Sequence, residues 1–349
     1  MKWLKFLFIF IPISIVLEMS GFHNPLVLFI VSCLSIIPLA GLMGEATEEI
    51  SVYAGSRVGG FLNATFGNAT ELIISILAIR AGLFDVVKAS IAGSVLGNTL
   101  LVLGASMFVG GLKYKSQKFN KKAIGMSTNM LLLAVIGLCI PAIFMHSIDS
   151  KLISTRYESL SVAVAVILLI VYILGLVFSF YTHKDIYGTE HDGSDKETKW
   201  SLKFSILVLV IATVLIAVES EFLVGSVEPM SKAIGLSEFF VGIILIPIVG
   251  NAAEHSTAII MALKNKMDVA VEISIGSSLQ IILFVAPILI FISLLFRPMS
   301  IVFNEFELIA LISSIFIVSK VASDGECNWL EGVQLMSVYL IIAIAFFII

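Results

Sequence analysis

The stretch Gly-Asn-Ala-Thr-Glu at residues 67–71 lies inside an apolar run, and Gly-Asn-Ala-Ala-Glu repeats it at residues 250–254. The segments 67–104 and 250–287 align without a gap, and 12 of their 38 positions are identical. Each copy therefore places a glutamate within an oily segment. An ionised carboxylate at bilayer depth costs at least about 2.5–3.5 kcal/mol on insertion scales. A duplicated one predicts a functional site.

The composition of the chain is that of an integral membrane protein. Hydrophobic residues make up 59% and charged residues 13%, with a mean hydropathy of +1.08. Soluble domains carry about 25% charged residues. The apolar runs suit helical spans of roughly 20 residues rather than short alternating barrel strands. The net charge of −4 does not indicate a nucleic-acid partner, and the three cysteines have no metal-ligand or disulfide spacing.

The hydropathy pattern predicts an all-α protein with 11 transmembrane helices. The second span is expected to continue past Gly44 as a helix with a polar face. No small-x-small cleavage site follows the first span, so it is expected to be retained. A polar stretch, His183–Lys199, separates the sixth span from the seventh. The predicted spans cover residues 4–20, 25–43, 59–80, 86–111, 123–145, 159–181, 202–223, 236–263, 269–295, 306–321 and 330–349.

The distribution of basic residues predicts the orientation of these spans. With the N-terminus in the cytoplasm, 15 lysines and arginines fall inside and 6 outside, which places the C-terminus outside. Glu71 then lies in the third span and Glu254 in the eighth. The two motifs are five spans apart, and an odd number makes the two copies cross the membrane in opposite directions. Inverted repeats around a central site are typical of transporters that work by alternating access.

The residues before each glutamate predict a break in the helix. Gly67 and Gly250 begin short runs of small residues, and Pro247 precedes the second run. A break frees backbone carbonyls, which a membrane tolerates only where they line a cavity or coordinate something. Carbonyls together with Glu71 and Glu254 form a set of hard oxygen ligands. Such a set suits Ca²⁺, which takes 6–8 oxygens at about 2.3–2.6 Å, and no cysteine or histidine cluster favours a softer metal.

Neutral polar residues surround both glutamates in the sequence, and their roles stay open. Asn68 and Asn251 are expected either to bind the ion or to cap the half-helices and bond the glutamates. Asn98 and Gln280 are expected to orient the glutamates, to meet the ion's water shell or to bond between helices. The remaining candidates are Ser94 and Ser277, whose Gly-Ser pairs allow close helix packing by default.

Three further residues have both a functional and a structural interpretation. By the predicted topology, Glu48 and Glu221 lie at opposite membrane faces. They would form cation-attracting mouths or be solvated helix ends. His255 follows Glu254 directly and would either relay protons or act as a hydrogen-bonding neighbour.

The chemistry of two converging carboxylates predicts the coupling ion. Their mutual repulsion raises the proton affinity of the pair, so Ca²⁺ and H⁺ compete for the same oxygens. Competition combined with alternating access gives an antiporter. The protein is therefore expected to be a transporter and not an enzyme. It would need no cofactor, with Ca²⁺ and H⁺ as its transported ions and the lipid bilayer as its surroundings.

At these motifs the chain resembles the Ca²⁺/H⁺ exchanger family of the cation/Ca²⁺ exchanger superfamily. The resemblance rests on GNATE, GNAAEH, the Gly-Ser pairs, residues 265–268 and the number of spans. It implies that Glu71 and Glu254 bind Ca²⁺ and exchange it for protons. It also implies one extra N-terminal helix, residues 1–22, before two inverted five-helix repeats, residues 23–182 and 200–349. The Na⁺/Ca²⁺ branch has hydroxyl-rich and Pro-Glu sequences at these motifs, so sodium coupling is disfavoured.

The sequence thus predicts export of cytosolic Ca²⁺ against proton entry, in the plasma membrane of a prokaryote; an organelle membrane stays open. The alternatives are a Na⁺-coupled or other divalent-cation exchanger and a passive Ca²⁺ or H⁺ channel. The cytoplasmic linker, residues 183–199, is short and of mixed charge, so regulation by ions is not expected there. Stoichiometry, selectivity among Ca²⁺, Mn²⁺ and Cd²⁺, and assembly into a homo-oligomer are left open.

Overall fold

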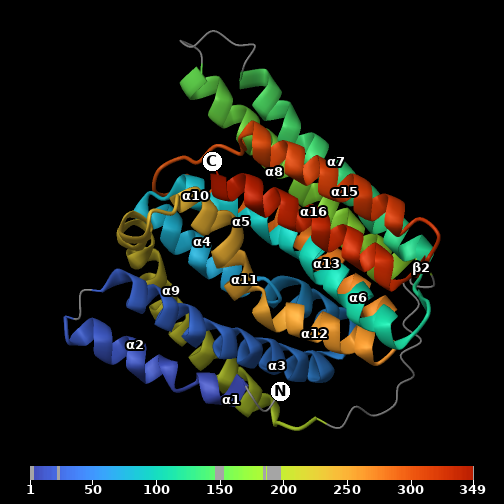
Figure 1. The fold of residues 1–349 in the computed structure, drawn as a ribbon, viewed down its shortest axis with the longest axis horizontal. Coiled ribbons are helices and arrows are strands. Elements are labelled where there is room, and N and C mark those ends of the chain that lie inside the picture. Colours follow the sequence, from blue (N-terminus) through green and yellow to red (C-terminus); the bar gives the residue numbers. More distant parts are fainter. Residues whose placement is uncertain (1–3, 22–23, 146–152, 184–185, 187–197, 349) are drawn as a thin grey trace. The chain divides into compact units, whose positions relative to one another are not determined.

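The computed structural model describes residues 4–21, 24–145, 153–183, 186 and 198–348 (Figure 1). Nearly all of these residues are helical, as the hydropathy pattern predicts. The chain forms two compact units: unit 1 holds Met1–Val87 and Glu190–Ala253, and unit 2 holds Lys88–Thr189 and Glu254–Ile349. Each unit draws on both halves of the sequence, so the units do not coincide with the predicted repeats. The division into repeats stays a prediction, and most of the predicted linker lies outside the described residues.

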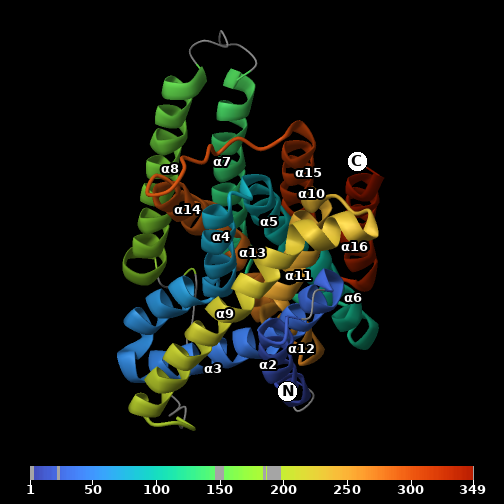
Figure 2. The same cartoon turned by 90° about the vertical axis from the view of Figure 1, so that its left-hand side faces the viewer.

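Unit 1 is built around two long helices that run side by side (Figures 1 and 2). Thr213 of α9 contacts Met43 of α3, and Trp200, just before α9, donates to Glu49 further along α3, so the two helices are antiparallel. A small apolar cluster of Leu39, Met43, Ala212 and Ile216 joins them. The helices of this unit are α1 (Leu4–Leu7), α2 (Phe10–Met19), α3 (Pro25–Phe66), α4 (Ala69–Ala81), α9 (Leu202–Ile234), α10 (Glu238–Phe240), the π-helix η4 (Val241–Leu245) and α11 (Ile246–Gly250).

Helix α3 confirms the predicted continuation beyond Gly44. Its start is fixed by Asn24, whose side chain accepts from the backbone N–H groups of Leu26 and Val27, with Pro25 in the first helical position. The helix then runs to Gly55, where φ of 82° and ψ of 164° interrupt the helical backbone. Glycine adopts this conformation without a Cβ clash. The remaining turns lead to Phe66, directly before the first motif.

Unit 2 contains the remaining helices and a short strand pair. Helices α7 and α8 pack as a hairpin, and α16 packs along α6 (Figures 1 and 2). Strands β1 (Gln117–Lys118) and β2 (Glu326–Cys327) pair antiparallel, which the sequence analysis did not predict. The helices are η1 (Gly97–Val102), α6 (Leu103–Lys113), α7 (Lys121–Met145), α8 (Ile153–Val177), η3 (Phe178–Thr182), α13 (Met267–Gln280), η5 (Ile281–Val285), α14 (Ala286–Ser293), α15 (Glu305–Val321) and α16 (Trp329–Ile348). Helices α5 (Phe84–Leu96) and α12 (Ala252–Leu263) begin in unit 1 and continue into unit 2.

Within the described part of the chain, seven helices are long and apolar enough to cross a membrane. The number is up to eight if the bent pair Glu238–Gly250 and Ala252–Leu263 counts as one span. The first predicted span is divided into α1 and α2 at residues 8–9, and α2 has only ten residues. Many leucines, isoleucines and phenylalanines are exposed along the helices, which suits a lipid-facing surface.

Candidate ion-binding site

The predicted helix break is present in the first motif. Helix α3 ends at Phe66 and α4 begins at Ala69, with Asn68 between them at φ −102° and ψ 23°. Glu71 therefore lies in the first turn of α4 and is 6% exposed. The partial positive charge at a helix N-terminus stabilises an anionic side chain in that position. Asn68 is buried beside it.

The second motif has the same local design. Helix α11 ends at Gly250 and α12 begins at Ala252, and Asn251 interrupts them at φ −92° and ψ 6°. Glu254 again lies in the first turn of the new helix. The Asn251 side chain donates to the carbonyl oxygen of Pro247 at 3.0 Å. The same carbonyl also accepts from the backbone N–H of Asn251 at 3.0 Å, so the side chain adds a second bond at the end of α11, and the role of Asn251 stays a prediction.

In unit 1 the two motifs meet. A Cβ atom added to Gly250 would lie 2.7 Å from Oε1 of Glu71 and 3.2 Å from its carboxyl carbon. The second motif's glycine thus lies directly against the first motif's glutamate. Only a residue without a side chain leaves this space to the carboxylate, which is a reason for glycine at this position beyond helix weakening.

Unit 2 contains a second set of contacts between the copies. The side-chain amide of Asn98 donates to Oγ of Ser277 at 3.1 Å, and its Oδ1 lies 3.0 Å from Nε2 of His255. Ser277 also hydrogen-bonds the Glu254 carboxylate, whose Oε2 is buried. Asn98 comes from the first copy and the other three residues from the second. The contact with Asn98 is that of a hydrogen-bonding neighbour, and relay of protons by His255 stays a prediction.

Two π-helices extend the duplication beyond what the residue identities indicated. Helix η1 follows the first Gly-Ser pair, and η5 follows the second. With the motif offset of 183 residues, Asn98–Val102 of η1 aligns in sequence with the whole of η5, Ile281–Val285. Wide helical turns of this kind occur frequently at functional sites. Their recurrence at equivalent positions marks the second half of each copy as part of the same architecture.

The other predicted residues are distributed as follows. Ser94 is buried in α5, and Gln280 is half-buried at the last position of α13. Glu48 on α3 and Glu221 on α9 are exposed. Their roles as ligands, supports or mouths stay predictions. Within the described residues, no group of three or more histidine, cysteine, aspartate or glutamate side chains could hold a metal.

Buried acidic residues lie beside the two mouth candidates, and of these the sequence analysis missed Glu219. Glu49, next to Glu48, is 8% exposed, and its carboxylate accepts from the N–H groups of Lys199 at 3.0 Å and Trp200 at 3.3 Å. Glu219, two residues before Glu221, is fully buried. Helical periodicity gave a signal for Glu219, because it lies on the same face as the core residues Ala212, Ile216 and Leu223.

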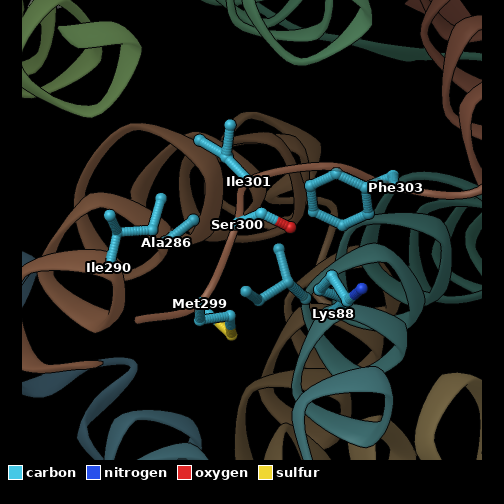
Figure 3. A pocket seen from close by; sticks show the side chains of 8 residues that line it. Lys88, Ala286, Ile290, Met299, Ser300, Ile301 and Phe303 are labelled. Carbon is cyan, nitrogen blue, oxygen red and sulfur yellow. The ribbon is translucent and has the colours of Figure 1, made fainter. Parts of the chain in front are cut away.

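A small pocket in unit 2 contains none of the predicted site residues. It lies between the N-terminal part of α5, helix α14 and the segment before α15 (Figure 3). Its only charged lining residue is Lys88, so it offers no carboxylate to a cation. The lining consists of Lys88, Ile91, Ala286, Ile290, Met299, Ser300, Ile301 and Phe303.

The chain matches the family model described as sodium/calcium exchanger protein over residues 24–181 and 204–348. It is 45% identical to the Ca²⁺/H⁺ antiporter ChaA of Bacillus subtilis, covering 97% of this chain and 96% of that protein. It is 43% identical to a Ca²⁺/H⁺ antiporter of Synechocystis sp., covering 98% and 96%. The solved structure of native YfkE matches with a TM-score of 0.85 at 42% identity, covering 98% of this chain and all of that one. The resemblance found in the motifs is confirmed: the chain is a multi-pass membrane protein and belongs to the sodium/calcium exchanger protein family, within the cation/Ca²⁺ exchanger superfamily.

Proposed function

We propose that this protein is a secondary active transporter that exports cytosolic Ca²⁺ in exchange for H⁺. The observation that carries the proposal is the full-length similarity to Ca²⁺/H⁺ antiporters at 43–45% identity. Bacterial relatives of this kind favour the plasma membrane of a prokaryote. The N-terminus is then cytoplasmic and the C-terminus outside, with 11 spans arranged as one extra helix and two inverted repeats.

In the proposed mechanism, Glu71 and Glu254 are the shared sites for Ca²⁺ and H⁺. Each carboxylate begins a helix directly after a break, where freed carbonyls and an asparagine add neutral oxygens. Deprotonated carboxylates bind the divalent ion, and protonation removes the negative charge that holds it. Alternating access exposes the site first to one side of the membrane and then to the other. Protonation of the carboxylates on the outside then releases Ca²⁺ there.

The neighbouring residues take supporting roles in this proposal. Ser277 and Asn98 orient Glu254 through the hydrogen bonds in unit 2. Gly67 and Gly250 contribute carbonyls or space, while Asn68, Asn251, Ser94 and Gln280 position the carboxylates or meet the ion's water shell. Glu48 and Glu221 attract cations to the two faces.

Transport in proteoliposomes tests the proposal. An imposed pH gradient is expected to drive uptake of radioactive Ca²⁺, and Glu71→Gln or Glu254→Gln is expected to abolish it. The matched control is Glu18→Gln, which changes an exposed glutamate of α2 and should leave uptake intact. Uptake driven by Na⁺ and indifferent to pH would instead identify a sodium-coupled exchanger. Uptake that follows only the Ca²⁺ gradient and voltage would identify a channel.

A further inference from the structure

Unit 1 contains a buried carboxyl group to which the transport mechanism assigns no role. Glu219 of α9 is 0% exposed, and its Oε1 lies 2.5 Å from the hydroxyl oxygen of Ser14 in α2. Ser35 of α3 lies beside this carboxyl group, but its hydroxyl donates to the carbonyl oxygen of Val31 at 2.9 Å. Oε2 is buried and has no hydrogen-bond partner among the described residues. Glu219 thus connects α9 with α2 and lies beside α3.

The number of available hydrogen atoms indicates the protonation state of Glu219. A serine hydroxyl has one hydrogen to donate, whereas backbone carbonyls and carboxylates only accept. The Ser14 hydroxyl oxygen also lies 2.7 Å from the carbonyl oxygen of Ile11. The single hydrogen of the Ser14 hydroxyl is therefore shared between two acceptor contacts, one with Ile11 and one with Glu219. A proton on the carboxyl group supplies the second donor, which the contact between Glu219 and Ser14 requires.

The described charged residues around Glu219 do not neutralise its carboxylate in place of this proton. Helices α2, α3, α4 and α10 pack against α9. Among the described ion pairs of the chain, none involves Glu219. The basic residues of these helices whose side chains the structure describes are exposed, and Lys232 is paired with Glu228. The described titratable and charged residues of the five helices are Glu18, Cys33, Glu45, Glu48, Glu49, Tyr53, Glu71, Arg80, Lys203, Glu221, Glu228, Lys232 and Glu238.

We propose that Glu219 is a proton-binding site inside the membrane-spanning part of unit 1, and that its bound proton fastens α2 to α9. An unpaired carboxylate in an apolar interior costs several kcal/mol, so the neutral acid is the form that this packing accommodates. Loss of the proton leaves the carboxylate facing serines whose hydrogens are already shared with carbonyls. The contact of α2 with α9 then weakens. This inference stands independently of the proposed transport cycle.

Infrared spectroscopy of the full chain in lipid nanodiscs tests proton binding directly. The carbonyl band of a protonated carboxyl group is expected at neutral pH, and Glu219→Gln should remove it while Glu18→Gln leaves it unchanged. The spectra of both variants are also recorded in a chain that carries Glu71→Gln and Glu254→Gln. This removes any contribution of the proposed ion site to the carboxyl band. Ser14→Ala keeps Glu219 but removes one partner and should shift the band. A protonated-carboxyl spectrum that Glu219→Gln does not change would overturn the proposal.

Thermal unfolding at several pH values tests the role of the proton in holding α2. The amide of Glu219→Gln keeps a donor but cannot lose it, so the variant imitates the proton-bound acid. The unfolding midpoint of the wild type should match that of the variant at acidic pH and fall below it as the pH rises. Glu18→Gln should follow the wild type throughout. A difference between wild type and Glu219→Gln that stays constant across the pH range would contradict the role in fastening α2.

Discussion

At the scale of single residues, Gly250 is the position where the smallest substitution has the largest expected effect on transport. Gly250→Ala places a Cβ atom 2.7 Å from Oε1 of Glu71. The carboxyl group is the end of a flexible side chain and can rotate away, so the stability of the protein should change little. The proposed ion ligand is displaced, however, and pH-driven Ca²⁺ uptake in proteoliposomes should be lost.

The control for this substitution is Gly225→Ala in α9, where an added Cβ has nothing within 4 Å. Adding a side chain there should preserve uptake and raise helix stability by about 0.5–1 kcal/mol. Normal uptake by Gly250→Ala would show that Glu71 does not need the space above the glycine. The observed packing would then be unrelated to transport.

The bond between Asn98 and His255 gives a second prediction at this scale. Combining Asn98→Ala with His255→Phe should yield a coupling energy of about 0.5–3 kcal/mol in unfolding experiments in mixed micelles, because the two residues share one partly buried hydrogen bond. Thr99→Val serves as the control, since the one hydrogen bond of the Thr99 side chain among the described residues is to the carbonyl of Val95, one turn earlier. The coupling energy of Asn98→Ala with His255→Phe is compared with that of Thr99→Val with His255→Phe. If the first is no larger than the second, the hydrogen bond between Asn98 and His255 contributes nothing to stability.

The sequence indicated the chemically unusual residues of the site better than their partners. Glu71 and Glu254 stand out because a carboxylate in an oily run is costly, and the breaks around them follow from local glycine, asparagine and proline. The partners of Asn98 depend on which helix faces lie together, which no local pattern contains. Glu219 was missed for a different reason: Glu221 was chosen because its stretch echoes that of Glu48 and lies at the opposite predicted membrane face, without applying helical periodicity.

At the scale of elements, the contact between α6 and α16 depends on glycines facing backbone atoms. A Cβ on Gly332 would lie 2.4 Å from the backbone nitrogen of Phe108 and 2.5 Å from the carbonyl oxygen of Gly104. Backbone cannot rotate away as the Glu71 carboxyl group can. Gly332→Ala should therefore separate the helices and destabilise the protein by about 1–3 kcal/mol, measured as a lower unfolding midpoint.

Gly125→Ala in α7 is the control for the contact of α6 with α16, because nothing lies within 4 Å of its added Cβ. It should unfold at or above the wild-type temperature. A Gly332→Ala variant as stable as the control would mean that α16 shifts along α6 without loss. These glycines would then have no role in the fold.

The strand pair β1–β2 gives a pH prediction outside the membrane. Lys118 lies 3.0 Å from Glu326, and Ser116 donates to the same carboxylate at 3.1 Å. The hydrogen bond and charge of Lys118, with the bond from Ser116, lower the pKa of Glu326. A lowered pKa means that the carboxylate stabilises the folded pair above its ordinary titration range. That contribution is lost as the pH falls through the lowered value.

Hydrogen exchange of the Phe119 amide, which donates to the carbonyl of Gly325 at 2.9 Å, reports on this strand pair. At neutral pH the amide should exchange faster in Glu326→Gln than in the wild type. The two proteins should converge in strongly acidic buffer, since the wild-type carboxyl is then neutral as well. A ratio of exchange rates that does not change with pH would show that the ion pair does not hold the strands.

The positions of the helices could be predicted from the sequence better than the places where helices are interrupted. Each predicted span falls on one helix or on a series of consecutive helical segments. Apolar runs of about 20 residues have few alternatives in a membrane. The strand pair was missed because two-residue strands have no periodicity. The break in the first span and the turn at Gly55 depend on packing and on one backbone conformation, neither of which hydropathy describes.

At the scale of the whole molecule, the proposed cycle depends on the two motifs having opposite orientations in the membrane. The loop before α7 and the loop after α14 are then separated by five spans and lie on opposite sides. Ser116 and Phe296 are exposed in these loops. In a chain whose three cysteines, of which Cys33 and Cys327 are buried, have been replaced, Ser116→Cys and Phe296→Cys report the side of each loop.

A membrane-impermeant thiol reagent added to intact cells should label Phe296→Cys and not Ser116→Cys. Inside-out vesicles should show the reverse, because 15 basic residues against 6 hold the first loop in the cytoplasm. Labelling of both positions from one side would mean an even number of crossings between them. The two glutamate motifs would then cross the membrane in parallel, and the inverted repeat on which alternating access rests would be excluded, whatever ion the protein binds.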